Sequence, residues 1–207
     1  MPFIKKHDQQ PVKNDERTQE RDCESLVLSL DNPDPVARRW AARDLVECPD
    51  ASAKLVERLR VEQDMSVRAV ILSSLTCLGD HTAVAGLVDC LRSEDAALRN
   101  ESIEVMKQLP DEVAPIMREL LHDTNDDVRI FAVNILESLC HPDVESWLLE
   151  VIENDPQINV CAAALDLLLE VGSKAAEQPL KRLQLRFADE AYFQFAINLA
   201  LRRIAED

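Results

Sequence analysis

Residues 64–79, DMSVRAVILSSLTCLG, decide the fold, because residues 95–110, DAALRNESIEVMKQLP, repeat the same design. Each stretch opens with an Asp, has an apolar residue three positions later and an Arg directly after it. Apolar residues then follow three and four apart, the spacing of one face of an α-helix. The apolar position recurs at spacings of 30, 31, 30, 32 and 32 residues, at Ala37, Val67, Leu98, Val128, Val160 and Tyr192. The chain is therefore predicted to contain six copies of one unit.

Two further columns of each unit are predicted to form the core, because they share the helical face of this anchor position. Four residues after the anchor stand Ala41, Ile71, Ser102, Ala132, Ala164 and Ala196, and eight residues after it stand Leu45, Leu75, Met106, Leu136, Leu168 and Ala200. An earlier apolar stripe precedes each anchor, such as Leu55, Val56 and Leu59. Each unit is thus a predicted helical hairpin of about thirty residues, which buries its apolar face only by stacking on its neighbours.

The Asp and the Arg of each unit predict a ladder between repeats. An Asp before a helix accepts hydrogen bonds from the first backbone N–H groups, while the Arg reaches a neighbouring turn. The Arg stands at positions 38, 68, 99 and 129, and Cys161 and Phe193 replace it in the last two units. We therefore expect the ladder to weaken towards the C-terminus.

The pattern Asp-x-x-[Val/Ala/Leu]-Arg, as in Asp64 to Arg68 and Asp95 to Arg99, resembles the HEAT-repeat superfamily. The thirty-residue length is most similar to its short branch, the repeats named after phycobilisome (PBS) lyases. The resemblance covers about residues 20–207 and is strongest in units two to four. It implies an all-α fold, a right-handed α-solenoid of about six two-helix repeats with one helix layer on the concave side. For function it implies mainly a protein-binding scaffold.

Composition narrows the function further. Three glycines in 207 residues leave little room for Gly-rich phosphate loops, and a net charge of −16 argues against binding to nucleic acid or to an anionic membrane. We expect a cytoplasmic protein, with a monomer as the favoured oligomeric state. Residues 1–19 are predicted to be a flexible N-terminal arm ahead of a repeat domain at 20–207. Phe3, Ile4, Lys5 and Lys6 make this arm either an ordinary tail or a docking motif.

Metal binding and catalysis find little support in the sequence. The cysteines contain no CxxC pair, so we expect no zinc site and six reduced, small core residues: Cys23, Cys48, Cys77, Cys90, Cys140 and Cys161. No His is followed by Glu, whereas some di-iron hydroxylases of the short-repeat branch bind metal through His-Glu pairs. We expect no cofactor and no catalytic residue. The repeat length leaves one enzymatic alternative, a subunit of a bilin lyase-like or other chromophore-handling enzyme.

Charge and helix geometry together predict a binding surface. Residues 111–172 carry −12 of the net −16, and no Lys or Arg occurs between Arg129 and Lys174. This acidity is either a solvated surface that keeps the protein soluble or a docking surface for a basic protein or peptide. The positions two, three, six and ten after the anchor point away from the core, and these outward columns should line the concave groove, with Trp40 and Phe131 as apolar hot-spot residues. The predicted partner-binding residues are Arg39, Trp40, Arg43, Glu101, Glu104, Phe131, Asn134, Glu137, Asp166 and Glu170.

Overall fold

The computed structural model describes residues 22–206 of the chain, and every regular element within this range is a helix. The predicted arm at residues 1–19 lies outside the described residues. The α-helices are α1 (Cys23–Ser29), α2 (Pro35–Asp44), α3 (Ala51–Leu59), α4 (Met65–Leu78), α5 (His81–Cys90), α6 (Ala96–Met106), α7 (Pro110–Val113), α8 (Met117–Leu121), α9 (Asp126–Leu136), α10 (Val144–Asn154), α11 (Ile158–Val171), α12 (Glu177–Arg186) and α13 (Ala191–Glu206). Three short 3-10 helices join them: η2 (Leu45–Glu47), η3 (Ala114–Ile116) and η4 (Lys174–Ala176).

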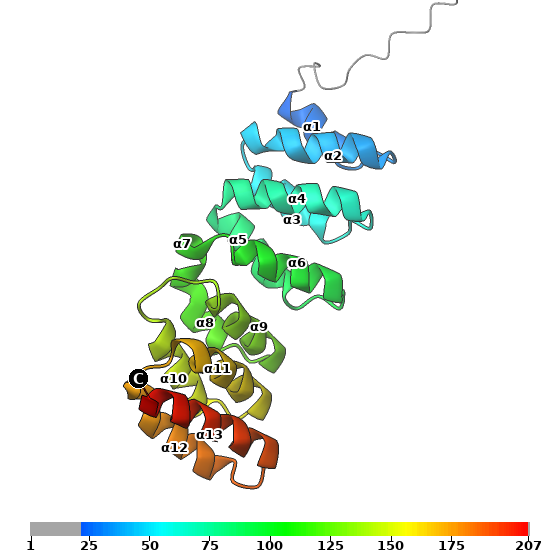
Figure 1. Cartoon of the computed structure of the whole chain (residues 1–207). Helices are drawn as coiled ribbons and strands as arrows, with labels where there is room; N and C mark the ends of the chain where they lie inside the picture. Colours follow the sequence, from blue (N-terminus) through cyan, green and yellow to red (C-terminus); the bar gives the residue numbers. More distant parts are fainter. Residues whose placement is uncertain (1–21, 207) are drawn as a thin grey trace, which may run out of the picture.

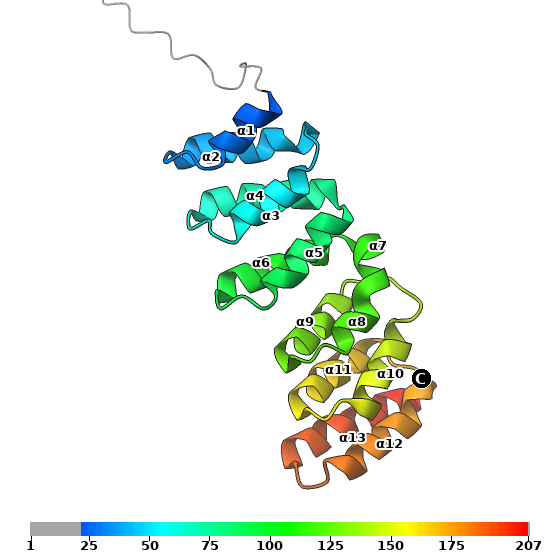
Figure 2. The same ribbon diagram turned by 180° about the vertical axis from the view of Figure 1, so that it is seen from behind.

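These helices form six hairpins stacked in a single row (Figure 1). The first helices of the hairpins, α1, α3, α5, α7 with α8, α10 and α12, make one layer, and the second helices, α2, α4, α6, α9, α11 and α13, make the other. Figure 2 shows the same row from the side of the first helices. The all-α array of two-helix repeats is thus confirmed, while its right hand stays a prediction.

The predicted core columns are confirmed almost throughout. The position eight after the anchor is buried in every hairpin, and the position four after it is buried in the first five. The exception is the last hairpin, where Tyr192 is 87% exposed and its neighbour Phe193 is buried. The anchor there is Phe193, whose ring packs edge-on against Phe187 at 5.5 Å between centroids. The assignment of Tyr192 was therefore wrong by one residue, because two adjacent aromatic residues fit the periodicity equally well.

Each second helix begins where the repeated acidic or amide residue caps it, up to the fourth repeat. The side chains of Asp34, Asp64, Asp95 and Asn125 accept hydrogen bonds from backbone N–H groups of the following first turn. Gln157 makes no such bond before α11. The helix starts are thus fixed by local hydrogen bonds, as expected for N-cap residues.

The predicted arginine ladder is present and joins consecutive repeats. Arg38 donates to both carboxylate oxygens of Glu62, at 2.8 and 2.9 Å, and Arg68 donates to Asp95 at 2.8 Å. Each of these guanidinium groups also donates to a carbonyl of the turn before its own helix. Within residues 22–206, the Arg99 side chain hydrogen-bonds its own turn alone, at the Ser93 carbonyl, and forms no ion pair with the next repeat. The side chains of Arg38 and Arg68 therefore each hold the turn inside their own hairpin and also fix the distance to the next hairpin.

At the joint between the fifth and sixth hairpins, the bridging arginine belongs to the later hairpin instead of the earlier one. Cys161 occupies the ladder position in α11, and its thiol is buried. Arg186 at the end of α12 reaches back to the carbonyls of Glu153 and Asp155, at 2.7 and 2.9 Å, and to the Cys161 sulfur. The column itself weakens as expected, because Gln157 makes no cap bond and Cys161 donates only to the carbonyl of its own turn, but Arg186 of the following hairpin bridges this joint instead.

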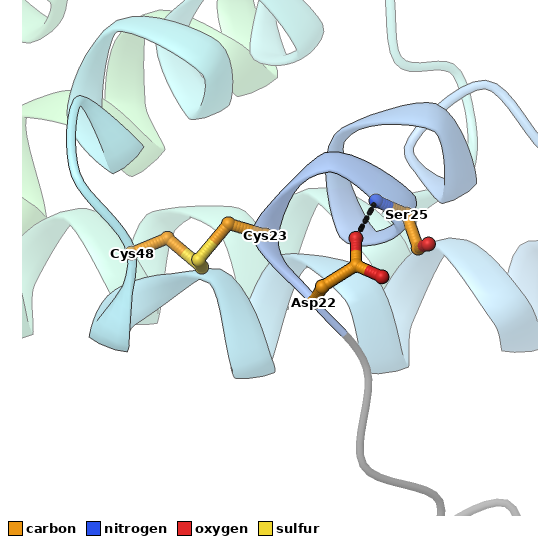
Figure 3. Close-up of a disulfide and its surroundings, with 4 residues drawn as sticks. All are labelled: Asp22, Cys23, Ser25 and Cys48. Carbon is orange, nitrogen blue, oxygen red and sulfur yellow. Dashed lines mark hydrogen bonds between the residues drawn. A yellow bond between two sulfur atoms is a disulfide. The ribbon is translucent and has the colours of Figure 1, made fainter.

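The expectation of six reduced core cysteines is wrong for four of them. Cys23 and Cys48 form a disulfide that joins the start of α1 to the residue after η2 (Figure 3). The first hairpin brings their Cα atoms to 5.7 Å although they are 25 residues apart in sequence. Cys77 and Cys140 are exposed, and only Cys90 and Cys161 are buried as expected. Disulfides persist mainly in oxidising compartments, so the cysteines do not support a cytoplasmic location.

Candidate functional site

The candidate site is the outward face of the second helices, and its predicted orientation is confirmed. All residues six and ten positions after the anchor are exposed in the first five hairpins, from Arg43 and Glu47 in the first to Asp166 and Glu170 in the fifth. In the last hairpin Asn198 and Arg202, which take these places when counted from Tyr192, are exposed as well. Residues three positions after the anchor are partly exposed in the first five hairpins, and Phe195 in the last is 67% exposed. The second helices therefore present a continuous row of accessible side chains.

The first end of this face is aromatic and basic. On α2, the Arg43 guanidinium lies 4.4 Å from the centroid of the Trp40 ring, in a cation–π arrangement. Arg43 also pairs with Asp44 at 2.8 Å, and its side chain is 55% exposed. Trp40 and Arg39 are partly exposed. This end thus offers an aromatic surface beside two arginines.

Between α4 and α6 the face is hollowed into an open cavity of about 650 Å³. Glu101 and Glu104 line it, together with the exposed Cys77. The Oε2 atom of Glu101 is buried and accepts no hydrogen bond, and Nη1 of Arg68 lies 3.7 Å away. The negative charge of Glu101 is thus balanced by Arg68 within the protein, and Glu104 is the exposed carboxylate of this cavity.

A lysine bridge joins the third and fourth repeats on the same face. Lys107 lies 3.5 Å from an oxygen of Glu104 and 3.1 Å from an oxygen of Glu137. Partial burial alone lowers the pKa of the Lys107 ammonium group. The carboxylates of Glu137 and Glu104 have the larger, opposite effect, so the pKa is raised overall. Beside the bridge, the Arg99 guanidinium lies 5.9 Å from the ring centroid of the partly exposed Phe131.

A second, smaller cavity of about 200 Å³ lies between α9 and α11. Asn134, Glu137, Asp166 and Glu170, four of the predicted partner-binding residues, line it together. Within residues 22–206, the carboxylates of Asp166 and Glu170 form no ion pair, and both side chains are exposed. The two stand four residues apart on one helix, where like charges repel each other. This cavity therefore concentrates uncompensated negative charge.

The ten predicted residues thus fall into three groups on one face. Arg39, Trp40 and Arg43 lie at its first end, Glu101 and Glu104 line the larger cavity, and the remaining residues surround Phe131 and the smaller cavity. The structure does not bring the three groups into one pocket. Sequence reasoning missed Thr76 and Asn100 in the lining of the larger cavity. Asn100 stands two positions after its anchor, in a column predicted to face outward, whereas Thr76 stands nine positions after its anchor, beside the outward tenth column.

Two kinds of site are not seen within the described range. No group of three or more His, Cys, Asp or Glu side chains in residues 22–206 is placed to hold a metal ion. None of the helices in this range combines the length and apolarity needed to cross a bilayer.

The chain has recognisable relatives among repeat proteins. A family model described as HEAT repeats matches residues 23–107, 52–130 and 113–202. An engineered protein of known crystal structure is 19% identical, with 90% of this chain and 98% of that chain covered and a TM-score of 0.39. A chain in the structure of the complex of CpcE and CpcF of phycocyanin lyase from Nostoc sp. PCC7120 is 17% identical. The match covers 98% of this chain and 100% of that chain, with a TM-score of 0.39. A second engineered protein is 18% identical over 88% of this chain and 58% of that chain, with a TM-score of 0.40. Among curated proteins the chain has no match.

Proposed function

Because this chain belongs to the HEAT-repeat family, we propose that it is a non-catalytic adaptor that binds a protein or peptide along the face of its second helices. In this proposal the face is the concave groove of the array. The closer packing of second helices against one another than of first helices against one another supports this choice. Neighbours approach more closely on the inside of a curved row.

One observation carries the proposal. The outward positions of the second helices are exposed along the whole row, and the face is hollowed at two places that both carry carboxylates of the predicted set. A repeat array offers such an extended surface without any single deep pocket. An extended polypeptide contacts several repeats at once, so it suits this surface better than a small molecule does.

The partner that we propose has a basic segment. Asp166 and Glu170 are exposed without an ion pair among residues 22–206. Lys and Arg side chains of a partner supply the positive charge and the N–H donors that Asp166 and Glu170 lack. Trp40 and Phe131, each with an arginine beside its ring, provide partly exposed aromatic surface, which is typical of binding hot spots.

Affinity capture from a lysate of the source organism, followed by binding measurements with the purified partner, tests this proposal. The test variant carries Trp40→Ala, Phe131→Ala, Asp166→Lys and Glu170→Lys. A separate charge-only variant carries Asp166→Lys and Glu170→Lys. Its matched control carries Glu24→Lys and Asp111→Lys, two exposed acidic residues of the first helices with the same change in net charge. Circular dichroism confirms that all three proteins stay helical.

We expect the four-residue variant to lose about tenfold or more in affinity, the charge-only variant to lose less, and the control to stay within about twofold. Equal binding by the wild type and the four-residue variant contradicts the proposed face. Equal losses in the charge-only variant and its control contradict the proposed charge complementarity, because net charge alone then explains the effect.

A further inference from the structure

The first helix of the fourth hairpin is broken by a proline, unlike the first helices next to it. Its residues divide into α7, the 3-10 turn η3 and α8, and Pro115 stands in η3. A proline inside a helix removes one backbone N–H donor, and its ring clashes with the carbonyl four residues earlier. The chain therefore changes direction at residues 114–116 instead of continuing as one straight helix alongside α5.

Beside this break, the outer side of the first-helix layer is hollowed. A cavity of about 520 Å³ lies between α5 and the α7–α8 segment. Its apolar surface comes from Val84 and Val88 of α5 and from Ile116 and Leu120 of the broken helix. Val84 and Leu120 are themselves buried, whereas Val88 and Ile116 are partly exposed. A volume of this size is within the range of ligand-binding sites. No residue of the second helices lines this cavity, so it is separate from the site described above.

The rim of this cavity carries negative charge that the molecule leaves uncompensated. Asp89 pairs with Arg60 at 2.7 Å, and Arg92 pairs with Asp123. Among residues 22–206, the exposed Glu112 and Glu119 on the broken helix make no ion pair. The rim thus combines two satisfied ion pairs with two free carboxylates on one side, next to an apolar floor.

This geometry points to a helical occupant. The cavity follows α5 from His81 to Asp89 and on to Arg92 just after the helix, and ten helical residues span roughly 15 Å. An amphipathic helix lies in such a groove with its apolar side chains at positions i, i+3, i+4 and i+7. Its flanking side chains then stand against Glu112 and Glu119, where Lys or Arg is favoured.

We propose that the cavity between α5 and α7–α8 is a docking site for a basic, amphipathic helix of about three turns belonging to a protein partner. The site goes beyond the proposed adaptor face, because it lies on the other layer of the array. One molecule then binds two partners at the same time, one on each layer. The interruption of the helix at Pro115 separates this segment from α5 and so forms the second site.

The test uses three fluorescein-labelled synthetic peptides of about 14 residues, roughly 21 Å of helix, and the full-length protein. The first peptide has Leu at i, i+3, i+4 and i+7 with Lys on both flanks. The second replaces Lys by Glu, and the third replaces Leu by Ala. Fluorescence anisotropy measures their binding to the wild type and to variants with retained helicity.

Two exposed alanines provide a matched pair of variants. Ala85→Trp fills the cavity between α5 and α8, and Ala69→Trp places the same ring in the cavity of the second helices. We expect Ala85→Trp to weaken binding of the Leu-Lys peptide about tenfold or more and Ala69→Trp to leave it within about twofold. We also expect Glu112→Lys with Glu119→Lys to weaken it, and the other two peptides to bind at least about tenfold more weakly.

Several outcomes overturn the proposal. Equal binding of the Ala-Lys peptide means that charge alone attracts the probe, and a loss confined to Ala69→Trp places the peptide on the other layer. A wild type that sediments as a dimer, with Ala85→Trp as a monomer, identifies a second copy as the occupant. Tighter peptide binding after Phe3→Ala and Ile4→Ala identifies the chain's own N-terminal residues instead.

Discussion

The guanidinium group of Arg129 donates two hydrogen bonds to the carboxylate of Asp155, at 2.6 and 3.1 Å, across the joint between the fourth and fifth hairpins. Both side chains are buried, at 10% and 5% exposed. Asp155 also accepts from the backbone N–H of Gln157, and Arg129 also donates to the carbonyl of Asp123. One ion pair thus fixes two turns and the distance between them.

Removing one partner of this pair should destabilise the protein strongly. Arg129→Met leaves the Asp155 carboxylate buried without its cation, which costs about 3–5 kcal/mol of unfolding free energy. The double variant Arg129→Met, Asp155→Leu removes the stranded charge and should recover part of the loss. Urea unfolding followed by circular dichroism measures both. A single variant within about 0.5 kcal/mol of the wild type contradicts this account, because surface substitutions have effects of that size.

Ionisation of Glu62 should make the free energy of unfolding depend on pH. Burial alone raises its pKa, but hydrogen bonds from Arg38, the Asp64 backbone and Arg58 outweigh burial and lower the pKa from 4.5 to about 2. Since the folded-state pKa lies below the unfolded value, the stabilisation is complete above pH 4.5 and is lost as the pH falls towards 2. The full effect is on the order of 3 kcal/mol.

The measurement compares urea unfolding of the wild type and of Glu62→Gln from pH 7 to pH 3. The wild type should be the more stable protein at neutral pH, and the difference should shrink below pH 4.5. A difference that stays constant over this range indicates that the carboxylate charge contributes nothing.

Gly86 in α5 should not tolerate a methyl group. A Cβ atom at this position lies only 2.3 Å from Cγ2 of Val56 in α3. Gly→Ala in a helix interior ordinarily stabilises by up to about 1 kcal/mol, but overpacking here should cost about 1–3 kcal/mol. Adding Val56→Ala should relieve the clash and make Gly86→Ala less harmful than in the wild-type background. Thermal unfolding of the four proteins in this cycle gives the coupling directly.

Reduction of the Cys23–Cys48 disulfide should loosen the first hairpin. A bridge between residues 25 apart stabilises by about 3 kcal/mol through its effect on the unfolded chain. The buried apolar side chain within α1 is Leu26 alone, so little else holds this helix. We expect Cys23→Ser with Cys48→Ser to lower the melting temperature and to increase amide exchange in α1 and α2 first. Cys77→Ser, an exposed cysteine outside the bridge, is the control and should change neither quantity.

Phe193 and Tyr192, the two adjacent aromatic residues of the last hairpin, should contribute very differently to the free energy of unfolding. Phe193 is 3% exposed and Tyr192 is 87% exposed. Phe193→Ala should therefore cost about 3 kcal/mol or more, whereas Tyr192→Ala should stay within about 0.5 kcal/mol. Chemical unfolding of the two single variants decides between the registers. The opposite ranking contradicts the placement of α13.

The regular part of the fold was predictable because the repeats average out local ambiguity. Val67, Leu98 and Val128 recur at nearly equal spacing, and all three are buried as the helical period requires. Tyr192 and Phe193 show the limit of this reasoning, since the periodicity accepts either residue. The capping role of Asp64 was predictable because it acts within two residues along the chain, and the reach of Arg68 to the next repeat was predictable because Arg and Asp recur at the same place in successive repeats.

Features that depend on contacts between hairpins were not predictable from spacing. The cysteine pair lies 25 residues apart, and the close approach of α3 that makes Gly86 necessary is a packing detail. Arg186 replaces the missing rung at Cys161 from the far side, which the column of arginines could not reveal. For the candidate site, the outward positions of Glu104 and Asp166 were predictable, but the two cavities that they line depend on how far neighbouring helices separate.

The way in which Arg38, Arg68 and Arg129 bond has a consequence for how such a chain grows. Each guanidinium binds a carbonyl of its own turn and an acidic side chain at the next turn. A gene segment that encodes the second hairpin therefore carries the donor for the joint after it, Arg68, and the acceptor for the joint before it, Glu62. Tandem duplication of that segment creates a complete new joint at once, without a compensating substitution elsewhere. Arg99 and Arg186 do not follow this rule, because Arg99 hydrogen-bonds its own turn and Arg186 reaches backwards, so duplication of the second hairpin is the one that adds a complete joint.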